Sequence, residues 1–133
     1  MKSTISWIDT EARIMLVESV GLWNPSDLLD SVQLVLSQTP QHLIWNPSNI
    51  MFHEAYLRSY EDSDSERKLA LDLMVKSLLN RTLKLLLIIQ TTDSVIFDIL
   101  YTVYYQNGAG HLVKFVESLN SASEIIEKHQ SLT

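Results

Sequence analysis

Residues 14–17 read Ile-Met-Leu-Val, and this stretch decides the predicted fold because it is apolar at every position. A strand with one wet face alternates apolar and polar residues, whereas an unbroken apolar run fits a strand that is covered on both faces. Helices on both sides of a mostly parallel sheet provide such cover. Residues 84–90, Lys-Leu-Leu-Leu-Ile-Ile-Gln, contain a longer apolar run, and we predict that they form the most buried strand. The sequence therefore predicts an α/β fold.

The rest of the chain supplies alternating strands and helices around these two strands. Residues 5–8 and 13–18, joined by the polar turn 9–12, predict an N-terminal β-hairpin. The other predicted strands are 42–45, 84–90 and 112–116, and the predicted helices are 24–38, 63–81, about 93–107 and 118 onward. After the hairpin each strand is followed by a helix, which is typical of parallel strands with right-handed crossovers. We predict one domain, residues 1–133, with a mixed, mostly parallel five-stranded sheet and about four helices.

Capping and turn residues mark several boundaries of these elements. Ser63 and Glu66 form a capping box that opens the second helix, and Ser118 can cap the last helix. Residues 46–49, Asn-Pro-Ser-Asn, are predicted to end the third strand. Residues 50–62 predict no regular element, and we expect a loop there.

Composition limits the classes of protein to which the chain can belong. Its 133 residues, 46 % apolar and 20 % charged, are typical of one globular domain. The formal net charge of −6 repels nucleic-acid phosphates and anionic membrane surfaces, so neither is a predicted partner. The chain has no cysteine, which excludes disulfides and thiolate chemistry. It also shows no signal-peptide pattern and no apolar run long enough to span a membrane, so we expect a cytoplasmic protein.

Sequence motifs for catalysis, metal binding or cofactor binding are missing. The four histidines are His42, His53, His111 and His129. None pairs with another at the i, i+4 spacing that places two imidazoles on one helix face. Residues 62–66 resemble the start of a calcium loop, but Arg67 and Leu73 stand where glycine and a bidentate glutamate are needed. We therefore predict no catalytic, metal or cofactor residues and a protein that is not an enzyme; an enzyme with a site assembled from distant Asp, Glu and His residues is the weaker alternative.

The predicted helix 94–106 carries more apolar surface than one sheet face needs. Beyond the arc that should face the sheet, an adjoining arc holds four aromatic residues: Phe97, Tyr101, Tyr104 and Tyr105. A neighbouring helix of the same domain can cover these rings, or they can form a subunit or partner interface, or they can line a small-molecule pocket. We adopt the interface hypothesis, with a protein partner or a homodimer, and keep a carrier of small apolar ligands as the alternative. Leu69 and Leu73, on the polar side of the predicted helix 63–81, are added to the same interface.

Three segments resemble the SpoIIAA-like, or STAS-like, families of small bacterial domains. They are Ile-Ser-Trp-Ile-Asp at 5–9 followed by Arg13-Ile14, Gly-Leu-Trp-Asn-Pro-Ser at 21–26, and Val-Glu-Ser-Leu-Asn-Ser-Ala at 116–122. The resemblance implies a STAS-like fold and a non-catalytic regulatory module. Family members act as anti-sigma-factor antagonists or as parts of signalling complexes, which implies a protein partner.

The resemblance does not extend to the phosphorylation switch of that family. The best-studied branch is phosphorylated at a serine in an Asp-Ser-Ser/Thr-Gly motif after the third strand, whereas this chain has Asn-Pro-Ser-Asn at 46–49. Ser63 and Ser65 stay as candidate acceptors because phosphate is stabilised at a helix start. Their role as helix caps is the favoured interpretation.

Overall fold

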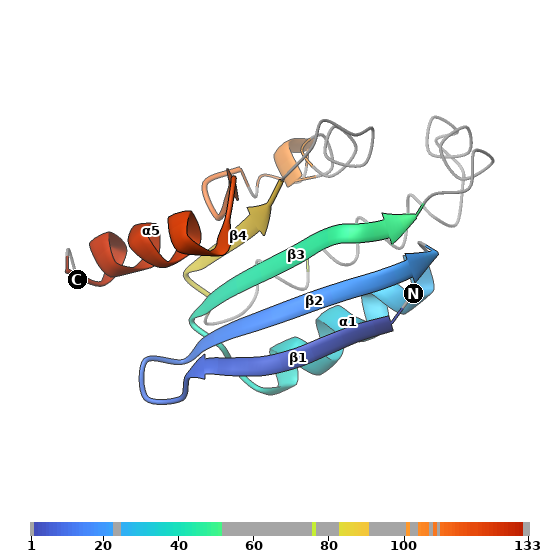
Figure 1. The fold of residues 1–133 in the computed structure, drawn as a ribbon, viewed down its shortest axis with the longest axis horizontal. Helices are drawn as coiled ribbons and strands as arrows, with labels where there is room; N and C mark the ends of the chain where they lie inside the picture. The colour runs from blue at the N-terminus through green and yellow to red at the C-terminus, as the bar shows by residue number, and fades with distance from the viewer. Residues whose placement is uncertain are drawn as a thin grey trace.

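The computed structural model describes residues 2–22, 25–51, 76, 83–90, 101, 104–106, 108 and 110–131. Five strands form one sheet in the order β1-β2-β3-β4-β5 (Figure 1). They are β1 Lys2–Asp9, β2 Ile14–Leu22, β3 His42–Met51, β4 Leu85–Ile89 and β5 Val113–Val116. β1 pairs with β2 in an antiparallel ladder, and every later neighbour pair is parallel. The prediction of a mixed, mostly parallel sheet that opens with a hairpin is confirmed.

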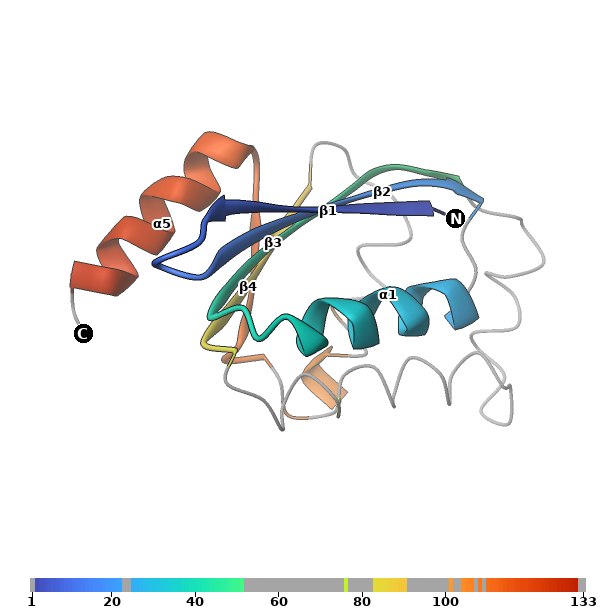
Figure 2. The same cartoon turned by 90° about the horizontal axis from the view of Figure 1, so that it is seen from below.

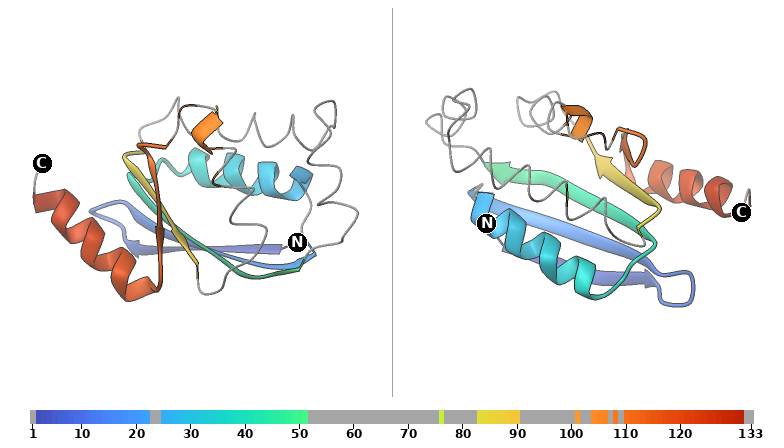
Figure 3. Two further views of the ribbon diagram at one scale, coloured as in Figure 1. Left: turned by 90° about the horizontal axis from the view of Figure 1, so that it is seen from above. Right: turned by 180° about the vertical axis from the view of Figure 1, so that it is seen from behind.

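Two helices cover opposite faces of this sheet. α1, Pro25–Ser37, lies on one face, and α5, Leu119–Ser131, lies on the other (Figure 2). α5 packs against β3, β4 and β5, at the edge of the sheet away from the hairpin (Figure 3). The three layers divide the buried apolar residues into two clusters. The first core cluster lies on the α1 face and the second on the α5 face.

β4 contributes to both clusters, because all five of its residues are buried. Leu86 and Ile88 belong to the first core cluster. Leu85, Leu87 and Ile89 belong to the second. Successive side chains of a strand point to opposite faces, so an unbroken apolar run can be buried only when both faces are covered. β2 follows the same rule: Met15 is buried in the first cluster, and Leu16 packs against the second.

A chain of hydroxyl groups joins α1 to the sheet on the first face. The Trp45 indole donates to Ser19 Oγ at 2.9 Å, and Ser19 Oγ lies 2.8 Å from Ser3 Oγ. Ser31 of α1 reaches Ser3 Oγ at 3.1 Å. Trp45 and Ser19 are both buried, so each polar atom depends on this network for a partner.

Arg13, in the hairpin turn, holds the end of α1. Its guanidinium donates to the carbonyl oxygens of Gln38 and Thr39 and, at 2.7 Å, to Thr39 Oγ1. These carbonyls follow the last helical turn, where backbone acceptors lack partners within the helix. The same guanidinium carbon lies 4.7 Å from the centre of the Trp7 ring, so one side chain ties β1, β2 and α1 together.

The third strand is longer than predicted, and the expectation that residues 46–49 end it is wrong. β3 continues to Met51, and it does so through a bulge in its pairing with β2. Glu18 pairs with Asn46 and Val20 pairs with Asn49, so two residues of β3 face one residue of β2. A bulge accepts a proline, which has no N–H to donate to the ladder. Residues 50 and 51, expected in a loop, therefore belong to the strand.

The predicted helices have different outcomes. α1 and α5 are confirmed, and Ser118 caps α5 by accepting the Ser121 backbone N–H at 3.1 Å. Lys76, Tyr101 and residues 104–106 are helical, while the rest of the predicted helices 63–81 and 93–107 lies outside the described residues. None of the helices within the described part of the chain has the length and apolar character that crossing a membrane requires.

We predict that Ser19→Ala destabilises the protein by about 1–3 kcal/mol, because it leaves the buried Trp45 N–H without its acceptor. Urea unfolding followed by tryptophan fluorescence measures the change. Ser123→Ala, at an exposed position of α5, is the matched control and should leave stability within about 0.5 kcal/mol of the wild type. An equal effect of the two substitutions would contradict the role given to the hydroxyl network.

Candidate functional site

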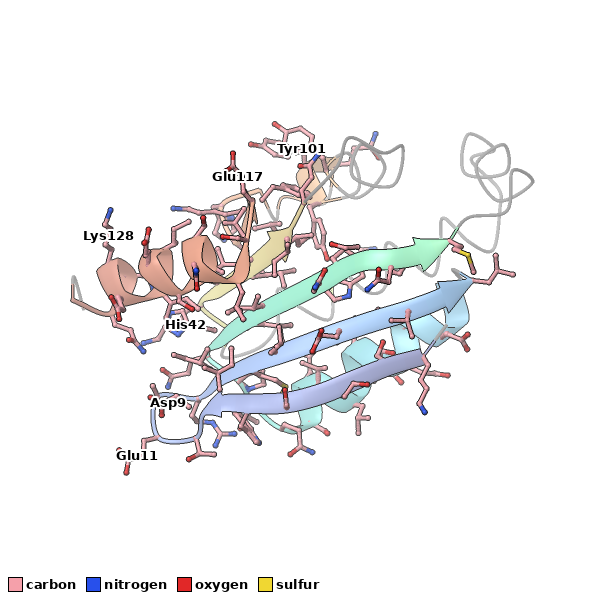
Figure 4. The ribbon with its side chains drawn as sticks, in the orientation of Figure 1. Asp9, Glu11, His42, Tyr101, Glu117 and Lys128 are labelled. Atoms are coloured by element: carbon pink, nitrogen blue, oxygen red, sulfur yellow. The ribbon has the colours of Figure 1, made fainter. Side chains whose placement is uncertain are left out.

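Tyr101 and Tyr105 form an exposed aromatic pair beside the last strand of the sheet. Their ring centroids are 4.3 Å apart with the planes tilted by 31°, as expected for residues one helical turn apart. The Tyr101 ring also lies 6.1 Å from the ring of Phe115 on β5. The two tyrosines keep 49 % and 57 % of their surface exposed. Figure 4 shows Tyr101 projecting at the periphery of the molecule, on the side of β4 and β5 away from the hairpin.

These rings form one wall of a groove of about 300 Å³. The groove, called here the aromatic groove, is lined by Tyr101, Tyr104, Tyr105, Gly110, Val113, Lys114, Phe115 and Ile125. Its described lining comes from helical residues among 101 and 104–106, from residues 110 and 113–115, and from α5. The groove therefore follows β5, which is the last strand of the described sheet.

Gly110 allows the Tyr105 ring to lie close to the backbone of the turn before β5. A Cβ atom at position 110 would lie 3.1 Å from two carbon atoms of that ring, which is tighter than ordinary van der Waals contact. Any residue with a side chain would push the ring away. The small residue thus sets the position of one wall of the groove.

Tyr104 belongs to the core, and its place in the predicted surface arc is wrong. It is 2 % exposed and packs in the first core cluster. Burial raises the pKa of its hydroxyl above the ordinary value of a tyrosine. On a helix, residue 104 is rotated by about 100° from residue 105, so one tyrosine faces the sheet while the next faces outward.

The described lining of the aromatic groove is mostly aromatic and aliphatic. Its lining offers aromatic and aliphatic carbon, phenolic hydroxyls and one cation, the exposed Lys114. The described residues that line the groove include no Asp, Glu or His. Across the part of the chain that the structure describes, no three His, Asp or Glu side chains gather as a metal site needs.

The other residues named from the sequence lie outside the described residues. They are Phe97, Leu69 and Leu73 of the predicted interface and Ser63 and Ser65 of the candidate phosphorylation sites. Two of the six predicted interface residues, Tyr101 and Tyr105, are thus brought together on the surface. Sequence analysis missed Lys114, Phe115 and Ile125, because their approach to the tyrosines depends on the packing of the last strand and the last helix.

Sequence analysis also missed a contact between the buried His42 and the half-buried His129. His42 Nε2 lies 2.9 Å from His129 Nδ1, although the residues are 87 positions apart. No local spacing could have indicated this contact, since it joins the first residue of β3 to the last turn of α5.

We predict that Tyr105→Phe lowers the pKa of the Tyr101 hydroxyl. In the wild type, a side-chain hydrogen bond with Tyr105 and then partial desolvation raise that pKa above the ordinary tyrosine value. Phenylalanine keeps the ring but removes the hydroxyl, so the neutral form of Tyr101 loses this stabilisation and the group ionises at a lower pH. Titration of the Tyr101 ring resonances by NMR measures the effect. An unchanged midpoint would contradict the hydrogen bond.

Comparison with known proteins adds a likeness of fold. No protein-family model matches the sequence, and no curated protein matches it. Among solved structures, an anti-sigma factor antagonist from Mycobacterium paratuberculosis has a TM-score of 0.55 at 12 % identity, over 95 % of both chains.

Two SpoIIAA structures give lower scores. Unphosphorylated SpoIIAA matches with a TM-score of 0.46 and 12 % identity, over 99 % of both chains. The phosphorylated Bacillus cell fate determinant SpoIIAA also gives 0.46 and 12 %, over 94 % of this chain and 99 % of its own. The sheet order, the N-terminal hairpin and the match to the mycobacterial antagonist together show that this chain has the SpoIIAA-like, STAS-like fold.

Proposed function

We propose that this protein is a non-catalytic regulatory module of the cytoplasm that binds another protein chain through the aromatic groove. The partner that we propose is a second copy of the same chain, so that the protein associates with itself. Charged groups are not needed for this function, and Lys114 is the one charged side chain among the described residues that line the groove.

The observation that carries the proposal is the exposure of two stacked tyrosines beside β5. Large aromatic side chains that stay half exposed leave apolar surface in contact with water, and association with another chain would remove it. Tyrosine is enriched at protein interfaces because it combines a large apolar ring with a polar end. The stacking of Tyr101 on Tyr105 holds both rings in place before a partner arrives, which reduces the entropy lost on binding.

The fold supports a role in regulation. The mycobacterial protein of the same fold is described as an anti-sigma factor antagonist, and we infer for this chain a regulatory role exercised through contact with another protein chain. A shared fold does not by itself carry function, so the proposal depends on the surface of this chain. The aromatic groove provides that surface.

We predict that replacing Tyr101 and Tyr105 together by serine converts the protein to a monomer. The double substitution removes both rings and leaves hydroxyl groups that water can solvate, so the driving force for association is lost. Light scattering at micromolar concentration measures the mass in solution. Leu34→Ser is the matched control, because Leu34 is 56 % exposed on α1 and does not line the groove; this variant should associate like the wild type.

Two outcomes would count against this proposal. A wild-type protein that is already monomeric in the same measurement would exclude the second copy as the occupant. An equal loss of association in Leu34→Ser would mean that the contact lies elsewhere or that association depends on general surface hydrophobicity.

A carrier of small apolar ligands is the second candidate, and the volume of the groove favours it. About 300 Å³ with a mostly apolar lining is at the lower end of the size range of small-molecule sites. We predict for this alternative that an aromatic or lipid-like ligand raises the Tm of the wild type but not that of Tyr105→Ser. A flat thermal response across lipids, nucleotides and aromatic compounds would reject the carrier.

A further inference from the structure

His42 and His129 form a hydrogen-bonded pair between the sheet and the last helix. His42 Nε2 lies 2.9 Å from His129 Nδ1, and the rings meet edge to face with centroids 5.1 Å apart. His42 is only 2 % exposed, whereas His129 is half-buried. Figure 4 shows His42 beneath the end of α5 that carries Lys128.

An additional N–H group on this pair would find no free hydrogen-bond acceptor. His42 Nδ1 is buried and has no hydrogen-bond partner. An unpaired N–H in a buried site is rarer than an unpaired acceptor, so the favoured tautomer of His42 carries its proton on Nε2 and donates it to His129 Nδ1. A proton added to His42 then sits on the unpartnered Nδ1. A proton added to His129 instead fills the acceptor that His42 requires.

The charged surroundings oppose protonation as well. Burial and then the nearby His129 and Lys84 lower the pKa of His42 below its ordinary value. His129 faces His42 from α5, and Lys84 directly precedes β4. On the β2 side, the partner of His42 in the ladder is the apolar Ile14, and the neighbouring Arg13 directs its guanidinium to Trp7 and the end of α1. No carboxylate among the described residues compensates a charge on His42.

We infer that the His42–His129 pair is a pH-sensitive latch that holds α5 on the sheet and releases it when His42 gains a proton. Ala122 and Ile126 are the residues by which α5 closes the second core cluster. Release of the helix would therefore open the apolar surface formed there by Ile44 and Leu87.

The direction of the pH effect follows from the lowered pKa. Once α5 is released, water reaches His42 and its pKa returns toward the ordinary value of about 6.5. The docked form then binds fewer protons than the released form at every pH near or below that value. Docking of α5 is therefore most favourable above about pH 6.5. As the pH falls below this value, the equilibrium constant for opening rises by up to about tenfold per pH unit for each proton bound.

Amide hydrogen exchange of the full chain, from about pH 7.5 to about pH 5 and corrected for the intrinsic rate, tests the latch. A released helix of this length is marginal in water, so its amides exchange once it leaves the sheet. We expect the opening constant at Ala122 and Ile126 to rise as the pH falls, while Val17 in the hairpin stays unchanged. A constant opening of α5 across this range, or an equal rise at Val17, would overturn the inference.

Three variants make the test specific. His42→Leu removes the buried titratable group and should leave the opening of α5 nearly independent of pH. Should that variant not fold, His129→Gln still provides a test, because the glutamine oxygen accepts from His42 Nε2 without titrating and should reduce the slope. His111→Gln, at an exposed position before β5, is the matched control and should retain the wild-type slope. The same flattening in His111→Gln as in His42→Leu would overturn the latch.

Discussion

The burial of β4 on both of its faces is the constraint on which the rest of the structure depends. Five consecutive apolar residues cannot be hidden by one layer, because alternate side chains of a strand point in opposite directions. The sheet therefore requires cover on each face. α1 lies on the face of the first core cluster, and α5 packs against β3, β4 and β5 on the face of the second. Both core clusters, the histidine contact and the α5 wall of the aromatic groove follow from this requirement.

Polar contacts decide how the layers are aligned once the apolar contacts have brought them together. Hydrophobic burial has no direction, so it leaves the position of a helix along a sheet poorly determined. Hydrogen bonds are directional, and here they occur at the junctions between layers. The Ser19–Trp45 network and the guanidinium of Arg13 position α1, whereas the His42–His129 contact positions the end of α5. We propose that the buried His42 also makes this contact sensitive to pH.

The aromatic groove lies along β5, where the described sheet ends. Tyr104 and Tyr105 are adjacent, yet the first packs in the core and the second remains half exposed. Tyr104 thus anchors these residues in the core, whereas we propose that Tyr105 contacts a partner. Gly110 gives the outer ring room, and Ile125 contributes from the opposite layer. An interaction surface of this kind needs no reactive groups, only apolar rings that are held in place.

The order of the five strands, α1 and α5 was determined by the sequence alone, because it follows from runs and periodicities within a few neighbouring residues. The unbroken apolar stretches at 14–17 and 85–89 indicated a sheet covered on both faces, and the turn residues separated the elements. Tertiary structure decided the continuation of β3 through Pro47, since the bulge that accommodates the proline requires β2 as a partner. It also decided which tyrosines reach the surface and which histidines meet. Those outcomes depend on contacts between residues far apart in the chain, and local spacing carries no information about them.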